Sequence, residues 1–166
     1  MQTYTNEKCG VSIQYPEEWE VENDDYKTEK LRSFIDISPD PDDFSNQISI
    51  GIWDISDYTE KTIEYISEVF RPLEDDSETG VIQDDIIQVG GFPAQKLAYF
   101  EGIPGEYEFQ EEKTHFLEIN ILAYDRVYQI YLEAENQENF DEYSPIVEQM
   151  KDTLKINKPN FEGINC

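Results

Sequence analysis

The sequence lacks any long apolar run. No apolar stretch approaches the roughly 20 residues that a transmembrane helix requires, so we expect no membrane insertion. The N-terminus also lacks a basic segment followed by an apolar one. Two alternatives follow: the protein is cytoplasmic, or a targeting segment was removed and a methionine added.

The motifs of common enzyme classes are missing as well. The chain has one histidine, His115, and no serine in the glycine-flanked turn that presents a hydrolase nucleophile. It has no phosphate-binding loop, no dinucleotide fingerprint and no zinc-binding helix with two histidines. Carboxylate pairs are abundant, but acid–base catalysis requires that one of them be desolvated. We therefore expect a non-enzymatic protein without catalytic or cofactor-binding residues, in which His115 lies on the surface.

Basic residues are scarce in this chain. Twelve lysines and arginines stand against 38 acidic residues, which gives a net charge of −26. Such a surface repels phosphate backbones and anionic lipids, so it argues against nucleic-acid and membrane-surface binding. The basic residues are scattered along the sequence, which predicts no positive patch. The charge is compatible with a basic protein partner, with divalent cations, or with solubility and salt adaptation alone.

Cysteines are few, and they lie near the two ends of the chain. In an oxidising compartment, Cys9 and Cys166 would form one disulfide that closes nearly the whole chain, which the loop-entropy model values at about 4–5 kcal/mol. In a reducing compartment they would be two free thiols. Neither belongs to a Cys-x-x-Cys pair, so zinc binding and redox catalysis are not predicted.

The sequence does contain regular strand and helix patterns. Alternating apolar residues predict strands at 11–15, 19–21, 34–38, 47–54, 81–89, 93–100, 117–123 and 128–134. We expect one helix capped by Asp57 and stopped by Pro72, and another capped by Ser144 with Pro145 at its first position. Gly90-Gly91 is typical of a hairpin turn. Strands joined by hairpins predict a single α+β domain, with a central antiparallel sheet flanked by helices.

Three motifs also occur in a characteristic order. The first is Gly10-Val11-Ser12-Ile13-Gln14-Tyr15-Pro16-Glu17-Glu18-Trp19, in which a proline ends one strand and a tryptophan begins the next. The second is the turn Val89-Gly90-Gly91-Phe92-Pro93-Ala94. The third is the strand Val127-Tyr128-Gln129-Ile130, followed by a helix from Tyr143 through Ile146 to Leu154-Lys155-Ile156. Together they resemble the PsbP-like family, named for the extrinsic photosystem II protein, although Asp125-Arg126 replaces an expected glycine-bearing turn.

The resemblance implies a PsbP-like α/β/α sandwich over residues 10–156, with a lead-in at 1–9 and a tail at 157–166. The best-known members of the family are extrinsic subunits that help to retain calcium and chloride at the photosynthetic manganese cluster, and they dock partly through basic residues. This chain reverses that charge, so we do not carry photosystem docking over. We expect an extracytoplasmic accessory module whose acidic surface docks to a partner protein or membrane complex. A cytoplasmic interaction module is the alternative.

Calcium binding through acidic loops is the alternative function. Asp36, Asp40, Asp42 and Asp43 offer oxygen ligands close together in the chain, as hard cations prefer, and Glu74-Asp75-Asp76-Ser77-Glu78 is a second candidate. The first loop lacks the central glycine and the terminal glutamate of an EF-hand. Both loops are equally explained as solvated surface.

Aromatic residues near turns suggest a surface for a partner. Tyr107, Phe109 and Tyr124 lie in or beside predicted turns, and tyrosines among carboxylates would suit a basic partner protein. Packing in the core or at sheet edges is the alternative. Some plant members of the PsbP-like family are thought to bind metals through histidine and carboxylates, but only His115 is available here.

Overall fold

The computed structural model of this chain describes residues 1–24, 28, 30–40, 45–72, 78–102, 105–106 and 109–159. The described strands are β1 (Gln2–Asn6), β2 (Val11–Tyr15), β3 (Glu20–Asp24), β4 (Leu31–Ser38), β5 (Asn46–Asp54), β6 (Gly80–Val89), β7 (Phe92–Glu101), β8 (Thr114–Ala123), β9 (Arg126–Ala134) and β10 (Lys155–Ile156). The described helices are α1 (Ile63–Val69), the 3-10 turn η1 (Gln110–Glu112) and α2 (Gln137–Thr153). Neither α-helix in these ranges is long and apolar enough to cross a bilayer.

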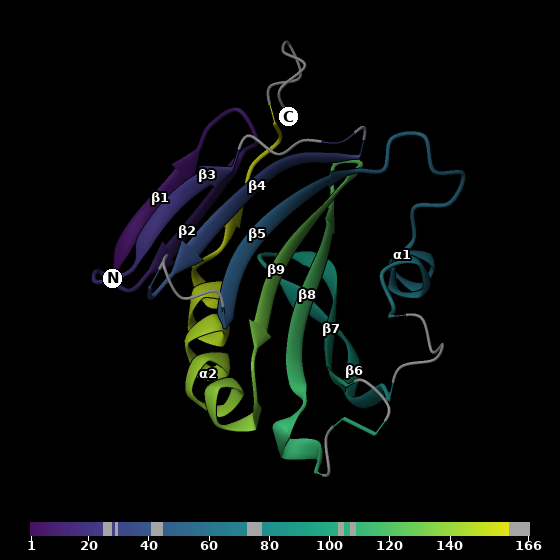
Figure 1. The fold of residues 1–166 in the computed structure, drawn as a ribbon. Helices are drawn as coiled ribbons and strands as arrows, with labels where there is room; N and C mark the ends of the chain where they lie inside the picture. The colour runs from purple at the N-terminus through teal and green to yellow at the C-terminus, as the bar shows by residue number, and fades with distance from the viewer. Residues whose placement is uncertain are drawn as a thin grey trace.

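Two antiparallel sheets organise these elements. The larger one has seven strands in the order β3-β4-β5-β9-β8-β7-β6, and the smaller one has the order β1-β2-β10. Figure 1 shows the large curved sheet with α2 and the β1–β2 pair at one side and α1 well apart from them. The predicted α+β class and its antiparallel sheet are therefore confirmed.

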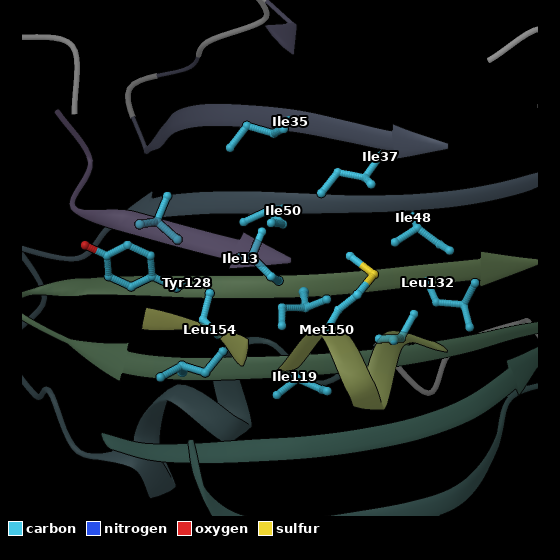
Figure 2. Close-up of a cluster of buried hydrophobic side chains, with 14 of the residues drawn as sticks. Ile13, Ile35, Ile37, Ile48, Ile50, Ile119, Tyr128, Leu132, Met150 and Leu154 are labelled. Carbon is cyan, nitrogen blue, oxygen red and sulfur yellow. The ribbon is translucent and has the colours of Figure 1, made fainter. Parts of the chain in front are cut away.

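The main core lies between the large sheet, β2 and α2. Isoleucines at alternate positions of β4 and β5 point into it, together with Met150 and Leu154 of α2 (Figure 2). The hydroxyl of Tyr128 donates a hydrogen bond to the Cys9 carbonyl at 2.9 Å. Trp19 meets Tyr143 of α2 edge to face, with ring centroids 6.1 Å apart. Trp19 thus packs against α2.

The opposite face of the large sheet carries α1 at one end. Side chains alternate between the two faces along a strand, so Tyr128 of β9 enters the main core while its neighbour Val127 faces α1. Val127 forms a small cluster with Ile55 of the loop before α1 and with Ile66 of α1. The ring of Trp53 packs edge to face on Phe70, with centroids 5.8 Å apart.

The opening motif does not form a hairpin with the following strand. The β2 strand pairs with β1 and β10, while β3 pairs with β4 in the other sheet. Pro16 ends β2, the Trp19 N–H donates to the Pro16 carbonyl at 3.2 Å, and the chain thereby passes from one sheet to the other. The predicted lead-in, residues 1–9, contains the strand β1. Its sequence, QTYTN, is mostly polar and has no apolar alternation that would predict a strand.

Both predicted helix starts are wrong. Thr62 caps α1, where its hydroxyl accepts the Tyr65 N–H at 3.3 Å, while Asp57 pairs with Lys30 instead. Asn136 caps α2 two turns before Ser144. Pro145 therefore lies inside α2.

Two tight turns use positive φ values. Gly90 and Gly91 have φ of +59° and +87°, as type I′ turns require. The turn between β8 and β9 consists of Tyr124 and Asp125, with φ of +50° and +57°. This corrects the predicted Asp125-Arg126 connection, since Arg126 is already the first residue of β9.

Candidate functional site

A groove of about 250 Å³ lies between α2 and the β6–β7–β8 part of the large sheet. It exists because α2 packs on β9, β2 and β8 and leaves the outer strands of that face uncovered. Most of its lining is apolar and comes from the sheet and from α2: Ile82, Ala98, Leu117, Phe140 and Pro145. The groove therefore offers an apolar floor beside the edge of the sheet.

One ion pair crosses this groove. Lys96 of β7 pairs with Glu148 of α2, and Glu148 also accepts a hydrogen bond from Lys151 at 2.9 Å. Burial raises the pKa of Glu148, but the hydrogen bonds from Lys151 and Lys96 outweigh it and lower that pKa below its usual value. The carboxylate thus stays ionised and paired, so it fixes α2 to β7.

The other face of the sheet holds a buried polar network. Gln95, Asn120 and Gln129 stand in register across β7, β8 and β9. Glu118 lies one row away and is 6% exposed. Its carboxylate accepts the Tyr99 hydroxyl at 2.8 Å and the Gln129 amide at 3.1 Å. The Glu118 carboxylate is bonded within the network, although the Asn120 Oδ1 has no hydrogen-bond partner among the described residues, and this mutual bonding favours a structural role over a catalytic one.

Burial raises the pKa of Glu118, even though hydrogen bonds from Tyr99, Asn120 and Gln129 act in the opposite direction. Because the pKa of Glu118 is higher in the folded state, protonated Glu118 contributes its full stability below the pKa of the unfolded state, and this contribution is lost as pH rises through the folded-state pKa. We therefore expect the free energy of unfolding of the wild type to fall relative to that of Glu118→Gln as pH rises from 4 toward neutrality. Urea unfolding of both proteins across this range tests the expectation.

The exposed Glu111 supplies the control for this measurement, since Glu111→Gln removes the same charge without burial. Its stability should run parallel to that of the wild type at every pH. Parallel curves for Glu118→Gln and the wild type would contradict the burial argument.

A third cluster centres on Asp54 at the end of β5. Its carboxylate accepts hydrogen bonds from Arg126 at 2.6 Å, from Arg32 at 2.7 Å and from the Ser56 N–H at 2.9 Å. Burial raises the pKa of Asp54, but the bonds from Ser56, Arg32 and Arg126 together lower it from 3.8 to about 2. The fold thus brings together Arg32 and Arg126, which are far apart in the sequence, and the carboxylate of Asp54 neutralises part of their charge.

His115 is buried, which corrects its predicted surface position. It is 0% exposed, and its Nδ1 lies 2.7 Å from the Lys113 carbonyl oxygen. Its ring lies between Phe100 and Phe140, with centroids 5.8 and 5.6 Å away. Side chains alternate along β8, so His115 lies on the core face together with Leu117. The spacing of these two residues in the sequence indicates the buried position, whereas the polarity of histidine favours the surface.

The predicted calcium ligands are only partly described by the structure. Asp36 is half-buried on β4, and Asp40 is exposed just beyond that strand, while Asp42 and Asp43 lie outside the described residues. Most of the second acidic loop, residues 74–77, lies outside them too. The part of the chain that the structure describes contains no cluster of three or more metal-ligating side chains. Calcium binding stays a prediction.

The other predicted site residues are placed as follows. Cys9 is 1% exposed just before β2, and Cys166 lies outside the described residues, so their pairing stays a prediction. Tyr107 also lies outside them. Phe109 is 57% exposed and Tyr124 is 40% exposed, so these two aromatic rings are on the surface.

Comparison with known proteins identifies the fold. No family model matches this chain, and no curated protein matches it. The solution structure of cyanobacterial PsbP from Synechocystis sp. PCC 6803 is similar, with a TM-score of 0.66 and 14% identity over 94% of this chain and 92% of that chain. At this identity the likeness shows the fold, which is PsbP-like.

Two other solved structures share the arrangement. A protein of unknown function from Pseudomonas aeruginosa, PA94, described as a putative regulator, has a TM-score of 0.56 and 14% identity over 96% of this chain and 99% of its own. LpqN of Mycobacterium tuberculosis, described as involved in cell envelope biogenesis, has a TM-score of 0.57 and 12% identity over 89% of this chain and 83% of its own.

Proposed function

Because the chain has the PsbP-like fold, we propose that it is a non-enzymatic accessory module that docks to a basic partner protein, outside the cytoplasm, through an acidic surface. The fold alone does not determine this, since one scaffold can host unrelated functions. The proposal depends on the surface charge of this chain and on the absence of a catalytic arrangement among the side chains that the structure describes.

The observation that carries the proposal is the internal pairing of the basic residues. Of the 12 basic residues in the sequence, 11 lie in the part that the structure describes, and eight of those form ion pairs with carboxylates of this same chain: Lys30, Arg32, Lys61, Arg71, Lys96, Lys113, Arg126 and Lys151. Little positive charge remains to offset the other carboxylates. The surface field is therefore negative, and it attracts and orients a basic partner.

Exposed aromatic rings support docking to a protein rather than to free cations. Phe109 and Tyr124 are exposed, and aromatic side chains are enriched in protein interfaces. Asp125 directly follows Tyr124, and Glu111 and Glu112 lie two and three residues after Phe109. This combination of rings and carboxylates suits lysine and arginine side chains, which bind carboxylates and also stack on aromatic faces.

The compartment is part of the proposal. LpqN, which shares the fold, is described as involved in cell envelope biogenesis, and we infer a comparable extracytoplasmic setting for this chain. Disulfide formation between Cys9 and Cys166 would fit such a setting.

The test is cross-linking in native extract at low salt, followed by calorimetry with the purified partner. We expect a basic partner whose association constant falls steeply as salt rises from about 50 to 500 mM, because screening shortens the range of exposed charges. An association that does not change with salt, or the recovery of no partner, would contradict the proposal.

A further inference from the structure

The outer edge of the large sheet is the strand β6. It has ten residues and pairs with β7 on its inner side only. In the described part of the chain, no strand pairs with its outer side. An edge strand presents unpaired N–H and C=O groups, which can accept a further strand.

Apolar side chains are concentrated on this edge. Three of the seven exposed large hydrophobic residues among those described lie on β6: Val81 at 39%, Ile82 at 49% and Ile86 at 52% exposure. Natural edges are commonly protected by lysine, proline or a β-bulge. β6 contains neither lysine nor proline, and its register with β7 shifts only between Val81 and Gln83, so the pairing is regular from Gln83 to Val89. Its charged residues are Asp84 and Asp85. The strand is thus long, apolar and negatively charged.

The edge and the groove form one continuous surface. Ile82 and Gln83 of β6 line the groove on the sheet side, while Phe140 and Pro145 line it on the α2 side. We call Ile82, Gln83, Phe140 and Pro145 the β6 edge surface. Val81 and Ile86 are in register with Tyr99 and Gln95, so they lie on the opposite face of the same strand. The groove volume of about 250 Å³ is below the roughly 300–1,000 Å³ of small-molecule sites, but it accommodates a large apolar side chain.

Charge decides between a second copy and a different partner. Antiparallel pairing of β6 with its own copy would bring Asp84 and Asp85 close to the same residues of that copy, and like charges opposite each other destabilise a strand pair. Each copy also carries a net charge of −26. Arg71 pairs with Asp84 at 3.5 Å, whereas Asp85 has no basic partner among the described residues. This edge therefore suits a strand that brings lysine or arginine.

We propose that an extended basic segment of a partner protein adds to β6 as an eighth strand and places a large apolar side chain in the groove. Backbone hydrogen bonds to β6 provide the affinity. Asp85 is in register with Lys96, which lines the groove, so Asp85 and the groove lie on the same face of the sheet. An apolar residue and a basic residue two positions apart on the partner strand share one face and can reach both. This inference rests on the proposed docking function, since it names the surface that the partner uses.

The probe is the nine-residue peptide Val-Val-Lys-Lys-Val-Val-Lys-Lys-Val, which presents both valine and lysine on each face when extended, titrated into the full ¹⁵N-labelled chain. We expect the largest amide shifts at residues 81–89 and at Phe140 and Ser144. N-methylation of alternate backbone nitrogens in the peptide keeps every charge and side chain but removes the hydrogen bonds to β6. It should weaken binding at least tenfold.

Two variants of the protein provide the matched comparison. Ile82→Lys places a positive charge at the mouth of the groove and should weaken binding at least tenfold. Val69→Lys makes the same change on α1, at a residue of similar exposure, 43%, and should leave binding unchanged. The amide spectrum of each variant verifies that it is folded.

The outcomes separate the two proposals. Equal affinity for the plain and the N-methylated peptide, with shifts spread over the acidic surface, would overturn strand addition and leave basic-partner docking intact. No binding of either peptide at low salt would count against both proposals. Binding to Ile82→Lys as tight as to the wild type would overturn the role of the β6 edge surface.

Discussion

Replacement of Asp54 by alanine is expected to lower the free energy of unfolding by about 3–5 kcal/mol, because it leaves a buried guanidinium without its counter-charge. The side chains of Asp54 and Arg126 are only 10% and 8% exposed, and their closest atoms are 2.6 Å apart. Arg32 loses the same partner. Such a loss is a large fraction of the 5–15 kcal/mol that stabilises an ordinary domain. Urea unfolding at neutral pH measures it.

The same residue predicts a loss of stability in acid. The pKa of Asp54 is lowered from 3.8 to about 2, so its contribution is complete above pH 4 and disappears as pH falls toward 2. The shift corresponds to about 2 kcal/mol. Asp57→Asn is the control, because Asp57 also pairs with a basic residue but its side chain is 68% exposed. This variant should leave the free energy of unfolding nearly unchanged, because exposed ion pairs contribute little. An equal loss in the free energy of unfolding for the Asp54 and Asp57 variants would contradict the claim that burial makes the Asp54 ion pairs important for stability.

Removal of the predicted disulfide should have an effect of similar size. The double variant Cys9→Ser and Cys166→Ser is expected to lose about 4–5 kcal/mol in an oxidising buffer, as the loop-entropy model gives for a loop of this length. The structure brings the C-terminal segment close to Cys9, because the Asn157 N–H donates to the Gly10 carbonyl at 2.7 Å. Gly10 has a φ of +70°, and a Cβ at that position would lie 2.2 Å from the Asn157 carbonyl oxygen.

After Asn157 nine residues remain, 158–166, and a chain can extend by about 3.3–3.6 Å per residue, which is enough for Cys166 to reach Cys9. Thiol titration and intact mass before and after reduction measure the pairing. Cys166→Ser should match the reduced wild type in stability, since both lack the bridge and keep Cys9 in place. Two titratable thiols in denatured protein from an oxidising compartment would contradict the pairing.

The sheet could be predicted well from the sequence, because alternation and turn chemistry act locally. Ile48, Ile50 and Ile52 share one face of β5 as their spacing requires, and Gly90-Gly91 forms the turn that its residue types favour. The helix starts were mispredicted because a local rule competed with packing. Pro145 suits a first helical position, but α2 begins earlier, where Phe140 and Tyr143 pack against the core.

The candidate site was harder to predict because it is assembled from residues that are distant in sequence. The groove joins Ile82 of β6 to Phe140 and Pro145 of α2, and no local pattern connects them. The Asp54 cluster likewise depends on Arg32 and Arg126 meeting across three strands. The outer side of β6 is exposed because β6 is the last strand of the sheet, and the sequence does not indicate the order of the strands.

The fold itself is a scaffold, and the surface carries the function that we propose. The chain shares its arrangement with cyanobacterial PsbP at 14% identity, so the likeness extends to the fold alone. The proposed basic partner depends on the net charge of −26, and its proposed place of docking depends on the exposed apolar side chains of β6.

Hydrogen exchange of the chain in complex with the partner recovered by cross-linking tests this account most directly. We predict that the amides of residues 81–89 gain protection in the complex, that those of α1 do not, and that the protection disappears as salt is raised. Unchanged exchange at β6 in a saturated complex, with protection elsewhere on the surface, would contradict it.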